Sequence, residues 1–198
     1  MINFSPMINI EDSTPLDITS ILLSKRIITI YGEIDDKMSE YVITAMKALE
    51  ILDSTKEIQL LINSPGGSIT AGLAIYDVMQ QIKTDVSTVC CGLAASMASV
   101  ILAGGTSGKR KIMPNADVMI HQLSGSITGN YLEIENITKR TKNLKNRVYH
   151  ILSEHCGKSI EEIERDCMSD YYLNASNTLN YGKKGICDVI LGTNFNGV

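Results

Sequence analysis

The segment Ile58-Gln-Leu-Leu-Ile-Asn-Ser-Pro-Gly-Gly67 decides the fold class, because it ends a buried strand in a glycine turn that leads into a helix. The run from Ile58 to Ile62 is short and mostly apolar, which is typical of a strand buried inside a protein. Apolar residues then recur every three or four positions from Ile69 to Ile82, and this spacing predicts an amphipathic helix. Residues 58–82 are therefore expected to form one strand, one turn and one helix.

The same alternation extends along the chain in both directions. We predict further strands and helices over these ranges: strands over 26–31, 86–91 and 117–121, and helices over 38–52 and 94–103. Alternating strands and helices are typical of an α/β fold with a mainly parallel sheet. No internal repeat or linker divides the sequence, so we expect a single domain over residues 1–198.

A long charged segment, residues 131–155, follows the last of these strands. Its apolar residues form a single stripe, made of Ile137, Leu144, Val148, Ile151 and Leu152. Since a helix with one apolar stripe is poorly suited to the centre of a core, we expect it to project and to pack against a partner such as a second subunit. The sequence Ser159-Ile-Glu-Glu162 is a capping box, which predicts a further short helix after a break near Gly157.

Composition excludes several classes of protein. A chain of 198 residues that is 44% hydrophobic is not intrinsically disordered, and a net charge of -4 argues against a protein that mainly binds nucleic acid. The five cysteines show no CxxC spacing, so neither a disulfide framework nor a zinc site is indicated. The first residues lack the basic start and apolar run of a signal peptide. We therefore expect a cytoplasmic protein.

One stretch is long enough to cross a bilayer, since residues 86–108 are 23 residues without a charge. Ten of these residues are Gly, Ser or Thr, and Gly104-Gly105 interrupts the run near its end. A buried strand followed by a buried helix is the better interpretation. We therefore predict no membrane partner.

Two glycine-rich stretches could bind a ligand. In Asn63-Ser-Pro-Gly-Gly-Ser68, Gly66 and Gly67 could let the backbone approach a ligand and direct an N–H at negative charge, although an ordinary turn before a helix explains the same residues. Residues 103–110 resemble a phosphate-binding loop. However, Arg110 stands where Ser or Thr must hold magnesium, and the segment follows a helix instead of a strand. We therefore predict no nucleotide site.

Ser96 is a candidate nucleophile. The predicted strand ends at Cys91 and the next helix begins around residues 94–96, so Ser96 is expected in the first helical turn, where backbone N–H groups are unpaired. The amide of Met97 could then stabilise an oxyanion formed when the Ser96 hydroxyl attacks a carbonyl. A small residue that lets helices pack closely is the alternative interpretation of Ser96.

A serine nucleophile needs a base, and His121 is the best placed of the three histidines. It ends the strand over 117–121, and the carboxyl ends of strands are where α/β folds place their active sites. A core histidine bonded to a carbonyl is the alternative. A third group must orient the imidazole, and spacing alone does not choose among Asp166, Asp170 and Asp188.

With these residues collected, the chain resembles the proteolytic subunits of Clp proteases, the ClpP family of serine peptidases (family S14). The resemblance runs from about Leu16 to Leu191 and rests on long motifs in order, including Tyr31-Gly-Glu-Ile-Asp-Asp36, Leu61-Ile-Asn-Ser-Pro-Gly-Gly-Ser-Ile-Thr-Ala-Gly72, Ala94-Ala-Ser-Met-Ala98, Val118-Met-Ile-His-Gln122 and Ile163-Glu-Arg-Asp166. It implies a crotonase-like α/β spiral of βαβ units with a projecting helical handle. The implied parts are an N-terminal axial segment or propeptide over 1–15, a head over 16–122 and 157–198, and a handle over 123–156.

The resemblance also implies an activity and its residues. Ser96 is implied as the nucleophile, His121 as the general base and Asp170 as the third triad member, ahead of Asp166 and Asp188, with Gly67 and Met97 as oxyanion donors. The implied protein is a serine endopeptidase subunit in two stacked heptameric rings, a tetradecamer that degrades unfolded polypeptides. A separate AAA+ unfoldase of the ClpX, ClpA or ClpC type would use ATP, so no cofactor and no metal are expected in this chain.

Four positions depart from the family pattern and motivate a second hypothesis. Aromatic or other apolar residues often form the unfoldase-docking cleft at positions that here hold Gln59, Leu61, Gln81 and Lys111. The alternative is a mainly structural subunit, or one that is active only in mixed rings with a second ClpP-type subunit. A crotonase-like acyl-CoA enzyme is less favoured, because it would not require a Ser, a His and an Asp together.

Overall fold

The computed structural model describes residues 7–8 and 16–192, and its mixed α/β architecture confirms the predicted fold class. Its main sheet has seven strands, of which five follow the order β3-β4-β5-β6-β9, while β7 pairs with both β5 and β8. Every pair in this sheet is parallel except β7–β8. The mainly parallel sheet that the alternating pattern predicts is therefore present, and it is consistent with the crotonase-like spiral that the family resemblance implies.

The strands of this sheet have the following bounds: β3 Ile27–Ile34, β4 Ile58–Gly67, β5 Val86–Ala95, β6 Arg110–Ile112, β7 Asp117–Ile120, β8 Tyr171–Asn174 and β9 Val189–Ile190. The helices are α1 Ile18–Ser24, α2 Asp36–Leu52, α3 Ile69–Gln81, α4 Met97–Ala103, α5 Tyr131–Cys156, α6 Ile160–Asp166 and α7 Ala175–Leu179. A short antiparallel pair of β1 (Met7–Ile8) and β2 (Leu16–Asp17) precedes them.

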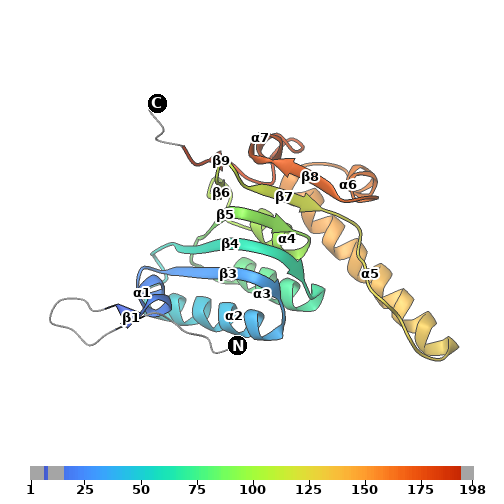
Figure 1. Cartoon of the computed structure of the whole chain (residues 1–198), viewed down its shortest axis with the longest axis horizontal. Helices are drawn as coiled ribbons and strands as arrows, with labels where there is room; N and C mark the ends of the chain where they lie inside the picture. The colour runs from blue at the N-terminus through green and yellow to red at the C-terminus, as the bar shows by residue number, and fades with distance from the viewer. Residues whose placement is uncertain (1–6, 9–15, 193–198) are drawn as a thin grey trace.

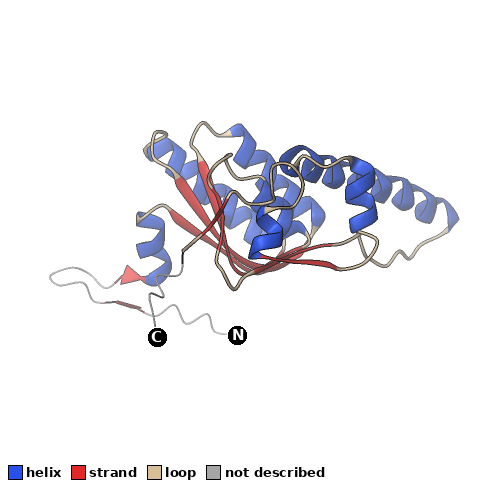
Figure 2. Cartoon of the chain, turned by 90° about the horizontal axis from the view of Figure 1, so that it is seen from above, coloured by secondary structure: helices blue, strands red, loops and turns tan. Residues whose placement is uncertain are grey.

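Helices α2, α3 and α4 lie on one face of the curved sheet (Figures 1 and 2). Alternate β-branched and leucine side chains of β3 and β4 point toward these helices and are fully buried, which is the half-buried pattern expected for strands with one covered face. The completely buried side chains of the two strands are Ile28, Ile30, Ile34, Ile58, Leu60 and Ile62. The core therefore sits between the central strands and these three helices.

The prediction of a helix over 94–103 was wrong at its start. The helix α4 begins only at Met97, because β5 continues through Ala95. Residues 93–95 pair in parallel with residues 117–119 of β7, so cross-strand hydrogen bonds override the helix propensity of the two alanines. Ser96 therefore caps α4 instead of lying in its first turn.

Several short elements carry no sequence signal strong enough to predict them. These are α1, β6, β8, α7 and β9, each of seven residues or fewer. The capping box at Ser159 and the short helix α6 that follows it are confirmed. The predicted axial segment or propeptide over residues 1–15 lies outside the described residues except for β1, so it stays a prediction.

Helix α5 projects from the head, as predicted (Figure 1). A capping box formed by Asn130 and Glu133 starts it, and Gly157, with φ of 72°, ends it in the left-handed conformation. Its buried residues all lie in its C-terminal third, from Val148 onward. Large apolar side chains near its start are exposed, namely Tyr131, Leu132, Ile134 and Ile137. Within the described chain, these apolar side chains at the start of the helix are left uncovered.

The uncharged stretch over 86–108 forms β5, α4 and the turn that follows them. Among the helices of the described residues, none has the length and apolar character needed to cross a bilayer.

Arg110 joins three parts of the chain from a position in which its side chain is almost completely buried. Its guanidinium pairs with the Asp188 carboxylate at 2.5 Å and donates to the carbonyls of His155, Lys184 and Gly185. These acceptors lie at the end of α5 and just before β9. One side chain on β6 therefore fixes the base of the projecting helix and the C-terminal segment.

Asp188 also pairs with the glycine-rich stretch over 103–110. The backbone amides of Gly108 and Arg110 donate to its carboxylate at 2.8 and 3.0 Å. Burial alone would raise the pKa of the Asp188 carboxyl, but the hydrogen bonds from Arg110 outweigh burial and hold the pKa below its usual range. The stretch that resembles a phosphate-binding loop thus binds a carboxylate of its own chain.

We predict that Arg110→Met lowers the free energy of unfolding by about 3–5 kcal/mol, because it leaves a mostly buried carboxylate without its charge partner and three carbonyls without their side-chain donor. Urea denaturation at fixed protein concentration measures this change. Arg140→Met is the matched control, since Arg140 is exposed on α5 and its loss should cost less than about 0.5 kcal/mol. Equal effects of the two substitutions would contradict the central role of Arg110.

Acid should remove the contribution of Asp188 to the free energy of unfolding. Because its pKa is lower in the folded chain than in the unfolded chain, ionised Asp188 adds stability above its unfolded pKa of about 3.9, and that stability is lost as the pH falls through the folded pKa. The difference in unfolding free energy between the wild type and Asp188→Asn should be largest at neutral pH and shrink between about pH 5 and pH 3. Denaturation curves over this range measure it, and a difference that does not change with pH would contradict it.

Candidate active site

Ser96 occupies a sharp turn between β5 and α4. Its φ of 53° and ψ of -124° lie in a region that residues with a side chain rarely adopt. The turn is held on both sides, since the Ser96 amide donates to the Met119 carbonyl at 2.9 Å and the Ser99 hydroxyl donates to the Ser96 carbonyl at 2.6 Å. A strained turn from strand to helix that presents a serine side chain is the geometry of a nucleophile elbow.

Gly66 makes room for this turn. A Cβ added at Gly66 would lie 2.6 Å from the Cβ of Ser96 and 3.0 Å from the amide nitrogen of Met97, so only glycine lets the end of β4 pass so close. Gly67 packs closely against the neighbouring strand β3, because an added Cβ there would lie 2.4 Å from the Ile34 carbonyl oxygen. The two glycines that the sequence singles out therefore bring the end of β4 against the Ser96 turn.

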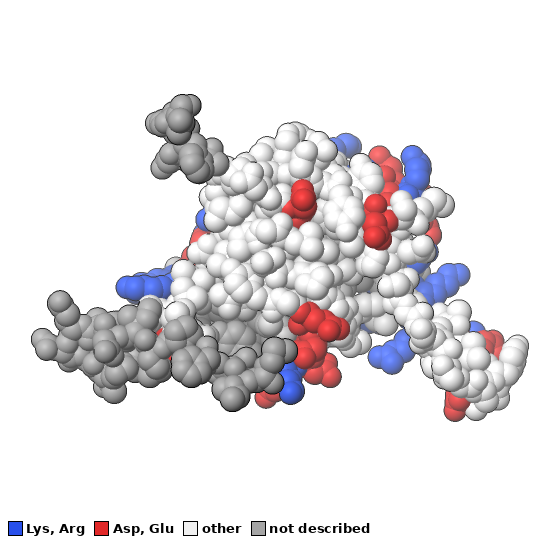
Figure 3. Space-filling model, in the orientation of Figure 1, with Lys and Arg blue, Asp and Glu red and all other residues white. Residues whose placement is uncertain are grey.

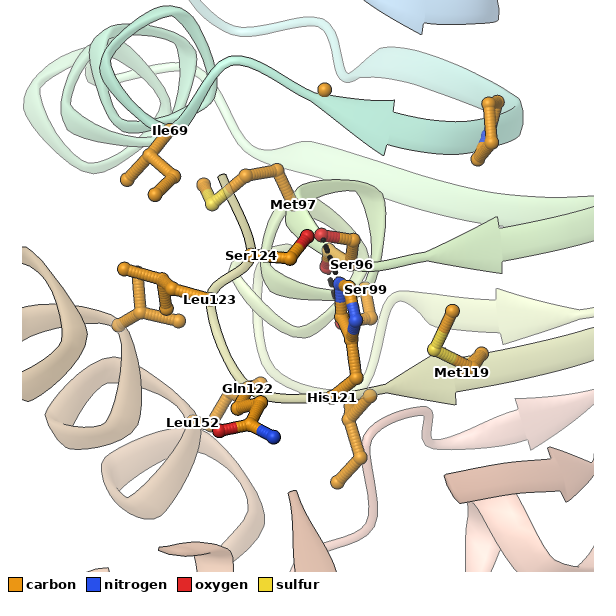
Figure 4. Close-up of a pocket in the computed structure, with 14 residues that line it drawn as sticks. Ile69, Ser96, Met97, Ser99, Met119, His121, Gln122, Leu123, Ser124 and Leu152 are labelled. Atoms are coloured by element: carbon orange, nitrogen blue, oxygen red, sulfur yellow. Dashed lines mark hydrogen bonds between the residues drawn. The ribbon is translucent and has the colours of Figure 1, made fainter. Parts of the chain in front are cut away.

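His121 follows directly after β7 and faces Ser96. Its Nε2 and the Ser96 Oγ are hydrogen bonded at 3.0 Å, and Figure 4 shows the imidazole reaching from the end of β7 toward the serine. The pairing of β5 with β7 fixes the position of His121 relative to Ser96. The Ser96 amide donates a hydrogen bond to the carbonyl of Met119, which lies two residues before His121. The structure thus brings together the predicted nucleophile and the predicted base.

The structure also distinguishes the three aspartates. The Asp170 Oδ1 lies 3.6 Å from the Nδ1 of His121, whereas Asp166 accepts hydrogen bonds from Lys158 and Tyr181. Asp188 binds Arg110, far along the sheet from this site. Of the three, Asp170 alone faces the imidazole. The distance exceeds that of a hydrogen bond, and the Asp170 side chain is 62% exposed, so this contact is loose.

A cavity of about 230 Å³ opens beside Ser96 (Figure 4). Its apolar wall comes from α3, the start of α4, the end of β7 and the C-terminal part of α5, and its residues include Ile69, Met97, Leu123, Val148 and Leu152. Gly67 also lines it, so both residues predicted as oxyanion donors border the same cavity as Ser96. A cavity of this size and character suits an apolar side chain next to the reacting group.

The amide of Met97 has no carbonyl partner within its helix, because Met97 is the first residue of α4. A carbonyl group bound against Ser96 could therefore receive this donor as its oxygen gains negative charge. The chemistry that the arrangement allows is attack by a serine hydroxyl on a carbonyl carbon, with a histidine to accept the proton.

Three contacts at the site were not predicted from the sequence. Leu123 and Ser124 line the cavity although they belong to a segment that reads as the polar start of the handle. The Gln122 side chain donates to the Met168 carbonyl at 3.2 Å, which links the histidine to the loop that carries Asp170. The order of residues in the sequence gives no signal for a contact between positions 46 apart.

All five cysteines are free, and four of them are buried. Burial raises the pKa of the Cys90 thiol to about 12, so this thiol is protonated and unreactive at neutral pH. Within the described residues, no cluster of three His, Cys, Asp or Glu side chains is arranged to hold a metal ion.

Comparison with known protein families adds one finding to this geometry. The family model of the Clp proteases matches residues 10–193, which is nearly the whole chain and includes every residue of the site described above. A match of this extent covers the sheet, the projecting helix and the C-terminal strands together. The chain therefore belongs to the Clp protease family.

Proposed function

We propose that this chain is a serine endopeptidase subunit of a Clp protease, with Ser96, His121 and Asp170 as its catalytic triad. One observation carries the proposal: the Ser96 hydroxyl, held in a strained turn, is hydrogen bonded at 3.0 Å to the Nε2 of His121. Membership of the Clp protease family supports the reaction class. The exposed, loosely held Asp170 is the least fixed member of the three.

The proposed mechanism uses each group once in each half of the reaction. Ser96 attacks the peptide carbonyl carbon as His121 takes its proton, and the amides of Gly67 and Met97 stabilise the resulting oxyanion. His121 then gives the proton to the leaving amine, which leaves an ester on Ser96. A water molecule, deprotonated by His121, hydrolyses this ester and restores the serine. Asp170 orients the imidazole and stabilises its charged form.

The surface supports assembly into rings. The first half of α5 exposes large apolar side chains, and the face of the sheet seen in Figure 3 has few charged side chains across its centre. Exposed large apolar residues on or next to the strands include Tyr31, Met113 and Val189. Apolar patches of this kind mark protein contacts. We propose two stacked heptameric rings that enclose the active sites and receive unfolded polypeptides.

The remaining parts of the proposal concern its partners. A separate AAA+ unfoldase of the ClpX, ClpA or ClpC type would deliver substrates and hydrolyse ATP, while this chain would need no cofactor of its own. The place of action is the cytoplasm. The Gln81 side chain accepts a hydrogen bond from Lys47 at 3.3 Å, so the docking cleft inferred from the family resemblance includes a polar pair here.

The exposure of Asp170 and its distance from His121 favour a second candidate function. Because its carboxylate is mostly exposed and lies beyond hydrogen-bond distance of His121, contacts from a neighbouring subunit could be needed to complete the triad. Under this alternative the chain is active only in mixed rings with a second ClpP-type subunit.

We predict that a fluorophosphonate probe labels Ser96 in the purified full-length chain and that His121→Ala abolishes this labelling, because the serine loses its base. Intact-protein and peptide mass spectrometry measure the adduct and its position. Ser124→Ala is a matched control, since it removes a second serine hydroxyl from the border of the same cavity and should leave the labelling of Ser96 in place.

The outcomes separate the alternatives. Label on Ser96 in the isolated chain supports stand-alone activity. Label that requires addition of a second ClpP-type subunit supports the mixed-ring function. An adduct on another serine would contradict the triad proposed here.

Asp170→Asn should lower kcat for a short fluorogenic peptide, but by less than the roughly 10⁴-fold typical of a buried triad aspartate, because Asp170 is mostly exposed. Steady-state kinetics measure the effect. Asp166→Asn provides a comparison, since it removes a charge from the same region without facing His121. A larger loss of kcat from Asp166→Asn that is not matched by lost stability would argue for a different third residue.

A further inference from the structure

We propose that Gln122 is a positioning residue that holds the Asp170 loop against His121. This inference rests on the proposed function, because it assumes that Asp170 acts through His121. The key observation is the hydrogen bond from the Gln122 amide to the Met168 carbonyl at 3.2 Å. Gln122 directly follows the base in sequence, and Met168 lies two residues before the carboxylate. The Gln122 side chain therefore connects the segment that carries His121 to the loop that carries Asp170.

The strand pairing next to the site stops just short of these residues. The last pair of the β7–β8 ladder is Ile120 with Tyr171, so His121 and Asp170 lie immediately beyond it on their two strands. The sheet brings the ends of β7 and β8 together, but its ladder does not include His121 and Asp170. Within the described part of the chain, the Gln122 bond is the polar contact that continues the pairing past this end.

The Asp170 loop has few other restraints. It leaves α6 at the C-cap residue Cys167, and the Met168 amide bonds back to Arg165 at 3.3 Å. Met168 is 70% exposed, so burial does not anchor the loop at this point. Apart from its approach to His121, the Asp170 carboxylate has no hydrogen bond or ion pair within the described residues. A single hydrogen bond can therefore change how often it faces the imidazole.

Gln122 borders the cavity beside Ser96, but its side-chain amide donates its hydrogen bond to the Asp170 loop. In Figure 4 its side chain extends away from Ser96, whereas the His121 side chain extends toward it. Its exposed amide reaches the Asp170 loop, and it takes no part in the hydrogen bond between Ser96 and His121. Loss of this hydrogen bond should therefore act mainly on the chemical step, through the Asp170 loop, and change binding of the peptide little.

The test is a double-mutant cycle in the full-length protein, with hydrolysis of a short peptide and the rate of fluorophosphonate labelling of Ser96 as readouts. Gln122→Ala and the isosteric Gln122→Glu, which cannot donate to Met168, should each lower kcat and the labelling rate about 3- to 10-fold, the size expected for one net hydrogen bond. KM should stay within about twofold, as expected when only the chemical step is affected. In an Asp170→Asn background, Gln122→Ala should cause no further loss, because both substitutions act on one interaction.

Asn177→Ala is the matched control, since it removes an exposed amide side chain from α7, away from the site, and should leave both rates unchanged. Thermal unfolding and gel filtration establish that each variant keeps its fold and assembly. The inference is overturned if Gln122→Ala costs the same factor with and without Asp170, if it raises KM with kcat unchanged, or if it has no effect. These outcomes leave Ser96 labelling of the wild type intact, whereas absence of that labelling would overturn the proposed function itself.

Discussion

The pairing of the last residues of β5 with β7 is the constraint on which the site depends. Because residues 93–95 stay extended to pair with residues 117–119, the chain must turn from strand to helix within one residue. That residue is Ser96, and its positive φ is the consequence. The same pairing delivers His121 at the end of β7, within hydrogen-bond distance of the serine. One strand contact therefore produces both the strained nucleophile and its base.

Stability and chemistry are separated in this fold. The buried Arg110 network closes the far side of the sheet with a charge pair and several carbonyl acceptors. At the opposite end of the strands, Asp170 is exposed and approaches His121 without a hydrogen bond. A buried charge pair tolerates little movement, since loss of one partner leaves a charge without solvation. An exposed carboxylate at 3.6 Å has no such penalty, so the triad contact is the part of the site most open to adjustment by neighbouring groups.

Local patterns in the sequence were enough to predict the sheet and the long helices and to single out Ser96 and His121 as candidates, whereas the family resemblance was needed to prefer their catalytic roles over structural ones. The run from Ile58 to Ile62 is short and apolar, and the apolar residues of α3 recur at helical spacing. His121 stands at the carboxyl end of a strand, where α/β folds place their active-site residues. The start of α4 could not be predicted in this way, because Ala94 and Ala95 favour a helix by themselves and are extended only through pairing with β7. Spacing alone also could not identify which of the three aspartates orients His121. It depends on the partners of Asp166 and Asp188, which come from distant parts of the chain, and family resemblance was needed to favour Asp170.

The projecting helix links assembly to the reaction site. Val148 and Leu152 of α5 form part of the cavity wall beside Ser96, while large apolar side chains near the start of the same helix are exposed. A continuous helix transmits a tilt of one end to the other, and α5 is a single element of 26 residues with no proline. Whatever covers the exposed half in the proposed rings therefore also fixes the position of the two residues at the cavity. Because interactions that place a substrate within reach of a nucleophile strongly affect the rate, assembly can control the activity without contacting Ser96 or His121.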